Sequence, residues 1–160
     1  MTADYRSWAA PARVMALAVD AAVAAARSCD AMAFADAVDD LSRVDREQLA
    51  VLLGTVTREL LERSHPDGLD SDDAEQVLRS CLCSAAGWYE RLDSELLVRA
   101  LTGALGITDP DEAPQADGTA VLTHGLLLIA DQLKVLAQQL PPLLDYALGE
   151  LMRAQTIEMP

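Results

Sequence analysis

The chain has 160 residues and a formal net charge of −14, with 26 acidic against 12 basic residues. Such a charge repels nucleic acid and anionic membrane surfaces, so we expect neither as a partner. Hydrophobic residues make up 51% of the chain but aromatic residues only 4%, so Leu, Val and Ala must form the core. Because Ala and Leu favour helices and strand-forming residues are sparse, the sequence predicts a single all-α domain of six or seven helices.

The N-terminal region predicts two helices. Pro11 suits the first turn of a helix that runs to about Ser28, because the N–H that proline lacks is not needed there. We expect one alanine-rich face of this helix to pack closely against another helix; its residues are Val14, Leu17, Ala21 and Ala24. Asp30 is a natural N-cap for the second helix. The buried face of that helix is predicted to consist of Phe34, Val38 and Leu41.

A longer third helix is predicted after Asp45, which can cap it with Gln48 at the capping-box position. Its apolar residues fall at spacings of four, three and four, which predicts one continuous buried stripe. These residues are Leu49, Leu53, Val56 and Leu60. The residue before Pro66 is disfavoured in the helical region, so the helix should end near His65.

The same segment, Asp45–Arg63, also resembles a bacterial helix-turn-helix, with Ala50 and Gly54 four residues apart. In that alternative, Arg58 would face a phosphate or a base edge of DNA. The unbroken apolar stripe and the net neutrality of the would-be recognition segment favour one continuous helix instead, as does Arg63, where the motif has an apolar residue. A DNA-binding regulator is therefore the weakest alternative function.

The acidic stretch from His65 to Glu75 predicts a turn followed by a helix start. Pro66-Asp67-Gly68 is typical of a turn, and the order of the acidic residues does not match a calcium-binding EF-hand loop. Asp72 and Glu75 have the spacing of a capping box. We therefore interpret this stretch as the connection between two helices.

The fourth helix is predicted to bury a stripe that consists of Ala74, Leu78, Cys81, Ala85 and Trp88. Cys81 should be buried and Cys83 exposed, which favours two separate thiols over a metal-binding pair. A fifth helix should begin near Asp93 or Ser94 and end at Gly106. Its apolar residues are Leu97, Leu101 and Leu105.

Residues 106–119 form the clearest linker, because they include two prolines, two glycines and four acidic residues. This linker separates a body of about residues 10–105, which should pack as a bundle, from a leucine-rich helical arm of residues 120–156, which should complete the bundle or reach a partner. In the arm, the spacing of apolar residues predicts a long helix, a break at Pro141-Pro142 and a shorter helix to about Gln155. The leucines exceed what one seam needs, so we expect a protein partner or a second copy to cover them. The predicted partner-binding residues are Leu122, Leu126, Leu127, Ile129, Leu133, Leu136 and Leu140.

Glu62 and His65 have the E-x-x-H spacing found in helical di-iron sites, but a second copy is missing, since Val121 stands three residues before His124. We therefore predict no metal and no other cofactor. One question stays open, namely whether a ligand from elsewhere in the fold joins Glu62 and His65. No serine elbow, glycine-rich phosphate loop or closely spaced Cys–His pair predicts a catalytic site.

Three cysteines are too few for a disulfide framework and fit a reducing cytoplasm. We expect neither export nor a membrane span, because Asp20 interrupts the apolar stretch near the N-terminus and no apolar run appears long enough to cross a bilayer. The single lysine, the lack of asparagine and the many Ala and Arg residues are typical of a high-GC bacterium or its phage.

Together these observations favour a non-enzymatic protein-interaction module, such as an adaptor, an inhibitor or an immunity-type regulator. Such a module would present an apolar helical face with an acidic rim to a basic protein partner, or associate with itself. The alternative is a helical bundle that binds a small apolar ligand or a metal, with enzymatic activity as a further option.

Overall fold

A computed structural model describes residues 5–107 and 118–158. Over these two ranges the chain forms seven α-helices and no strand, which confirms the all-α prediction. In chain order they are α1 (Ala10–Arg27), α2 (Ala31–Leu41), α3 (Arg46–Ser64), α4 (Ser71–Ala85), α5 (Ser94–Ala104), α6 (Gly118–Leu136) and α7 (Leu140–Glu158). Most of the predicted linker, residues 108–117, lies outside the described residues.

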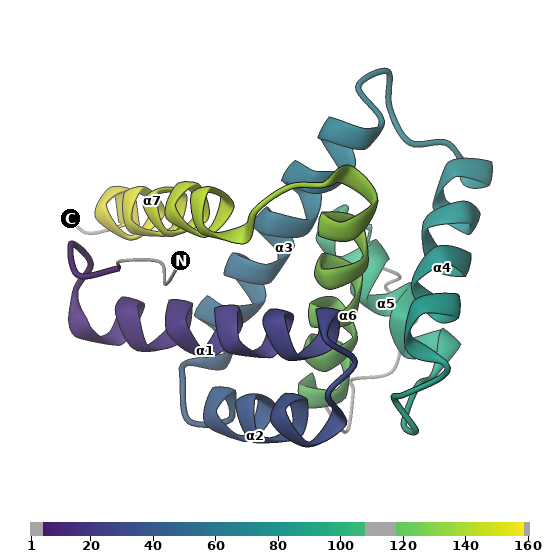
Figure 1. Cartoon of the computed structure of the whole chain (residues 1–160). Coiled ribbons are helices and arrows are strands. Elements are labelled where there is room, and N and C mark those ends of the chain that lie inside the picture. The colour runs from purple at the N-terminus through teal and green to yellow at the C-terminus, as the bar shows by residue number, and fades with distance from the viewer. Residues whose placement is uncertain (1–4, 108–117, 159–160) are drawn as a thin grey trace.

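Helix α6 stands in the middle of the molecule (Figure 1). It packs against α1, α3, α4 and α5, and every residue from Thr123 to Leu133 is buried. The segment expected as a C-terminal arm therefore completes the bundle, with α6 at its centre. The leucine surplus has the same explanation, since Leu127 and Leu128 are buried against other helices of the same chain.

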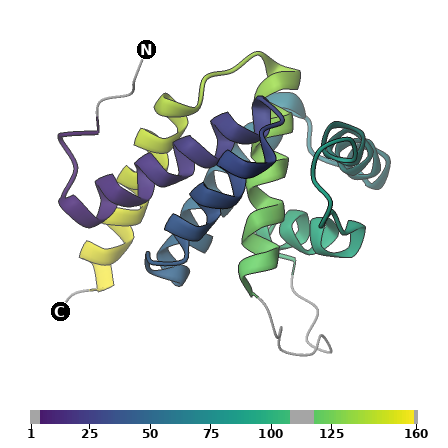
Figure 2. The same ribbon diagram turned by 60° about the horizontal axis from the view of Figure 1, so that its bottom comes forward.

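The remaining helices surround α6 in two groups. Helices α1 and α7 lie on one side, where α7 packs against α3 and α1, and helices α4 and α5 lie on the other (Figures 1 and 2). Helix α2 packs mainly against α1, and its Phe34 also contacts Trp88 and Tyr89 in the α4–α5 connection. Beside these contacts lies an open groove, which is described below.

Four helices begin at an aspartate whose carboxylate accepts a hydrogen bond from a backbone N–H in the first turn. Asp30 and Asp45 do so as predicted, and Asp93 does so at the start of α5. Helix α4 differs from the prediction, because Asp70 and Asp73 form the capping box in place of Asp72 and Glu75. Part of the acidic charge therefore has a structural role at helix starts.

The predicted buried face of α1 is wrong. The side chains of Val14 and Leu17 are 55% and 47% exposed, and Ala21 and Ala24 are exposed as well. The opposite face is buried instead, because α1 places Met15, Val19, Ala22 and Val23 against the core. In a helix so rich in alanine, both faces are apolar, so periodicity alone does not indicate which one the other helices cover.

The break between α6 and α7 also differs from the prediction. Ala137 adopts a left-handed conformation with φ of 53°, and the N–H of Gln138 donates to the carbonyl of Leu133, so the helix ends before the two prolines. Pro141 and Pro142 lie in the first turn of α7, where their missing N–H groups are not needed. Helices α6 and α7 each span 19 residues, so the second helix is not shorter than the first.

Helix α6 is long and apolar enough to cross a membrane when judged by length and composition alone. This finding corrects the expectation that no segment reaches that length. In the structure, however, its neighbours bury most of the helix, and core helices of soluble proteins meet the same two criteria.

The left-handed Ala137 generates a prediction for stability. Replacing Ala137 with Gly removes the clash of Cβ with the backbone, and we expect the free energy of unfolding to rise by about 0.5–1 kcal/mol. As a matched control, Ala21→Gly on the exposed face of α1 should lower it by about 1 kcal/mol. Urea unfolding followed by circular dichroism measures both changes, and a loss of stability in Ala137→Gly would contradict the assigned conformation.

Candidate functional site

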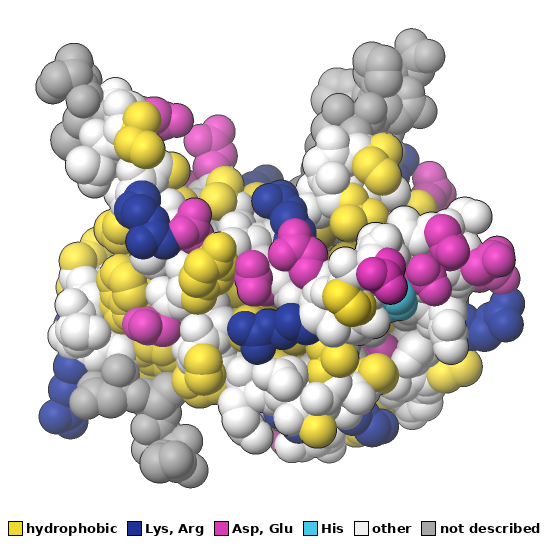
Figure 3. Space-filling model, turned by 90° about the horizontal axis from the view of Figure 1, so that it is seen from above, with side chains coloured by type: hydrophobic (Ala, Val, Ile, Leu, Met, Phe, Trp, Pro, Cys, Tyr) yellow, Lys and Arg dark blue, Asp and Glu magenta, His cyan; other side chains and the backbone are white. Residues whose placement is uncertain are grey.

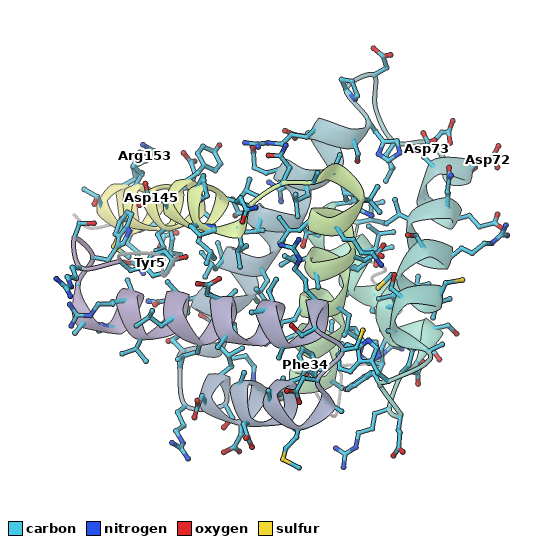
Figure 4. All side chains as sticks on the ribbon, in the orientation of Figure 1. Tyr5, Phe34, Asp72, Asp73, Asp145 and Arg153 are labelled. Atoms are coloured by element: carbon cyan, nitrogen blue, oxygen red, sulfur yellow. The ribbon has the colours of Figure 1, made fainter. Side chains whose placement is uncertain are left out.

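Three of the six aromatic side chains in the sequence meet at one end of α2. The ring of Phe34 lies edge-on to Trp88 and Tyr89, with centroid distances of 5.3 Å and 5.5 Å. Tyr89 also lies edge-on to the imidazole of His124, at 5.9 Å. Phe34 points from α2 toward the first turns of α6 (Figure 4). Through these ring contacts, the aromatic cluster packs α2 against the connection between α4 and α5.

His124 lies beneath the cluster and is 1% exposed. Its Nε2 accepts a hydrogen bond of 3.0 Å from the backbone N–H of Asp93, and its Nδ1 lies 2.7 Å from the carbonyl oxygen of Ala120. A neutral imidazole with its proton on Nδ1 satisfies both contacts. Because both ring nitrogens are occupied, His124 fixes the start of α5 against α6 and offers no lone pair to a bound molecule.

An open groove with a volume of about 780 Å³ lies between α2, the α4–α5 connection and the first turns of α6. Its α2 wall follows one face of that helix over its whole length, and it consists of Ala31, Phe34, Ala35, Val38, Asp39 and Ser42. Trp88 and Tyr89, both half-buried, close one end. The groove therefore has a largely apolar wall and an aromatic end. Its volume lies in the range that suits a small ligand or the side chains of a partner.

The rims of the groove carry more acidic than basic charge. Asp39 on α2 and Glu90 on the α4–α5 connection line it on different sides, against one lining arginine, Arg91. Arg43 lies 3.6 Å from Asp39 and 3.9 Å from Asp40, and all three side chains are largely exposed. Such exposed ion pairs are weak, so a cationic group on a partner could replace Arg43 at Asp39 with little loss.

The structure places the seven predicted partner-binding residues inside this chain rather than on its surface. Five of them are at most 3% exposed, and Leu122 and Leu136 are partly buried against the same core. Their apolar surface is used to pack α6 and the start of α7 against the other helices. A partner surface must therefore be sought among side chains that these helices leave uncovered.

Among the residues that the structure describes, no third metal ligand joins Glu62 and His65. The Nδ1 of His65 lies 2.8 Å from the hydroxyl of Ser64, and its Nε2 lies 3.9 Å from a carboxylate oxygen of Asp73. Within residues 5–107 and 118–158, no group of three or more His, Cys, Asp or Glu side chains is arranged to hold a metal ion. The acidic side chains gathered around the α3–α4 turn cap α4 and lie on the surface (Figures 3 and 4).

The segment that resembles a helix-turn-helix forms one unbroken helix, α3, as the apolar stripe predicts. Arg58 lies on the exposed side of α3, but its guanidinium is engaged within the chain. Its Nε and Nη2 donate hydrogen bonds of 3.2 Å and 3.1 Å to the carbonyl oxygen of Ala104, the last residue of α5. The guanidinium therefore stabilises the C-terminal end of α5, where backbone carbonyl groups carry partial negative charge.

The predicted difference between Cys81 and Cys83 is confirmed, because Cys81 is buried and Cys83 is exposed. Burial and, to a smaller extent, the nearby carboxylate of Asp131 together raise the pKa of the Cys81 thiol to about 12. Asp131 is itself buried and accepts a hydrogen bond of 2.6 Å from the hydroxyl of Ser84. The C-x-C pair is therefore one core thiol and one surface thiol.

Most of the groove was not predicted from the sequence. The predicted buried face of α2 is confirmed for Phe34 and Leu41, with Val38 partly buried, but the open groove beside that face was not expected. The adjacent residues Trp88 and Tyr89 were the available signal, since two neighbouring aromatic residues stand out in a chain with so few. Their approach to α2 depends on tertiary contacts that no local pattern encodes.

The environment of Cys81 predicts how the cysteines react. With a pKa of about 12, Cys81 carries roughly a thousandfold less thiolate at pH 8 than an ordinary cysteine. Iodoacetamide should therefore modify Cys29 and Cys83 in the native protein and all three cysteines in denaturant, as measured by mass spectrometry. Modification of Cys81 at the rate of Cys83 in the native state would contradict the buried position.

No protein-family model, curated protein or solved structure matches this chain. What the groove binds must therefore be inferred from its own shape, side chains and charge. Those features are an apolar wall along α2, two half-buried aromatic rings at one end, more acid than base at the rims, and a histidine whose nitrogens are both occupied.

Proposed function

We propose that the protein is a non-enzymatic interaction module that holds an apolar segment of a partner protein in the groove beside α2. The observation that carries this proposal is the groove itself, which stays open although the half-buried rings of Trp88 and Tyr89 would gain from further burial. Half-buried aromatic rings are typical anchors at protein interfaces, where they supply most of the binding energy.

The charge of the chain supports a basic partner. A net charge of −14 speeds the approach of a positively charged protein within about one Debye length, beyond which salt screens the attraction. Asp39 and Glu90 then lie where such a partner would make its closest contacts. An adaptor, an inhibitor or an immunity-type regulator would use a surface of this kind.

The groove is poorly equipped for catalysis. His124 is the histidine that lines it, and hydrogen bonds occupy both nitrogens of its ring. A general base needs a free lone pair within reach of the proton that it removes. Binding without chemical conversion is therefore the function that these side chains support.

A second candidate is a small apolar ligand, which the size of the groove favours. Pockets for drug-sized molecules typically have volumes of about 300–1,000 Å³ and apolar walls, and this groove of about 780 Å³ falls in that range. Native mass spectrometry of protein purified from its own host distinguishes the two candidates. A bound molecule of small mass would favour the ligand, and a bound polypeptide the interaction module.

The interaction role predicts that an arginine substitution at one exposed alanine abolishes partner binding, whereas the same substitution at a neighbouring alanine does not. Ala35 lines the groove, whereas Ala33 is exposed on the same helix outside it. We expect Ala35→Arg to abolish affinity capture of a specific host protein, because the longer side chain fills the groove, while Ala33→Arg retains it. Circular dichroism checks that both variants fold, and equal capture by the two variants would exclude the groove as the binding site.

A further inference from the structure

We infer that the occupant of the groove is a basic, amphipathic α-helix of about three turns, contributed by a partner protein. This inference rests on the proposed interaction role and names the kind of segment that the groove accepts. Its support comes from the groove's length, from the backbone of its α2 wall and from the charges of its rims.

The length of the groove matches a short helix. The lining residues of α2 recur at helical spacing from Ala31 to Ser42, so the wall follows one face of the helix for about 16 Å at 1.5 Å per residue. The opposite wall is a second helix, because Thr119, Ala120 and Thr123 of α6 line it. A third helix of about eleven residues, laid between these two, would run the same distance.

The backbone of α2 favours a helical occupant over an extended one. Because α2 is a regular helix from Ala31 to Leu41, its N–H and C=O groups are already paired. An extended peptide laid along this wall would find no strand edge with which to form backbone hydrogen bonds. A helix satisfies its own backbone groups, so it can enter an apolar groove without that cost.

The side chains along the wall suit close packing of a helix. Ala31 and Ala35 are exposed and small, so a neighbouring helix axis can approach α2 closely at these positions. Trp88 and Tyr89 at the end of the groove offer a contact for one large apolar anchor. Apolar side chains at every third or fourth position of a partner helix would then contact the α2 wall one after another along the groove.

The rims select a basic rather than an acidic helix. Asp39 and Glu90 line the groove on different sides, and Asp36 and Asp40 are exposed farther around α2. A helix with Lys or Arg on both sides of its apolar stripe would place positive charge near both rims. Two arginines oppose part of this negative charge, Arg91 in the groove and Arg43 beside Asp39 and Asp40, in a chain whose net charge is −14.

Synthetic peptides test the inference directly. We use an amidated, acetylated peptide of about 14 residues with Leu at every third or fourth position and Lys elsewhere. Three peptides of equal length serve as comparisons: a sequence scramble, a version with Glu in place of Lys, and a version with a central proline. The Trp8→Phe variant leaves Trp88 as the single tryptophan, so its fluorescence reports occupation of the groove.

We expect the basic amphipathic peptide to shift Trp88 emission and to bind about tenfold or more tightly than each comparison peptide. Ala35→Arg should lower this affinity by about tenfold or more, whereas Ala33→Arg, which adds the same charge outside the groove, should leave it within about twofold. Binding should weaken as NaCl rises from about 50 to about 500 mM, because salt screens the rim charges.

Each other outcome contradicts part of the inference. Equal binding of the proline peptide would overturn the helical occupant, and equal binding of the Glu peptide would overturn the basic one. Equal affinity of Ala35→Arg and Ala33→Arg would place the peptide outside the groove. If no peptide affects Trp88 while Ala35→Arg still abolishes capture of the host protein, the helical inference fails and the interaction role stands.

Discussion

The fold depends on the burial of α6. A helix whose residues are covered over three consecutive turns, from Thr123 to Leu133, needs neighbours on every side. Helices α1, α3, α4 and α5 supply them, and their order around α6 fixes the rest of the architecture. Burying each leucine side chain of α6 contributes about 2 kcal/mol relative to exposure, so this helix is a large part of the stabilisation.

The groove follows from how that burial is completed. Helix α2 packs mainly on α1, and its Val38 and Leu41 line a small cavity together with Leu122 and Leu126 of α6. The edge-on contacts of Phe34 with Trp88 and Tyr89 join α2 to the α4–α5 connection. Beside these contacts a wall of small and apolar residues lines the open groove, with carboxylates at its rims. The contacts that attach α2 to the bundle therefore also border the groove.

Several polar residues of this chain stabilise the scaffold. Aspartates cap α2, α3, α4 and α5, Arg58 stabilises the end of α5, and His124 joins α5 to α6. The hydrogen bond from partly buried Ser84 to buried Asp131 links α4 to α6. Each of these groups resembles a functional residue in the sequence, yet its hydrogen bonds are made within the fold. Several groove residues differ from these polar groups, because part of their apolar surface stays exposed to solvent.

The sequence by itself determined what depends on near neighbours along the chain. Asp30 and Asp45 cap their helices, the stripe from Leu49 to Leu60 is buried, and α3 is continuous, because capping and helical periodicity act within a few residues. Tertiary structure decided which apolar face is covered. Which helices pack together determines the exposed face of α1, the central position of α6 and the groove between α2 and α6. The spacing of apolar residues shows that a helix face is apolar, but it does not show which other helix covers that face.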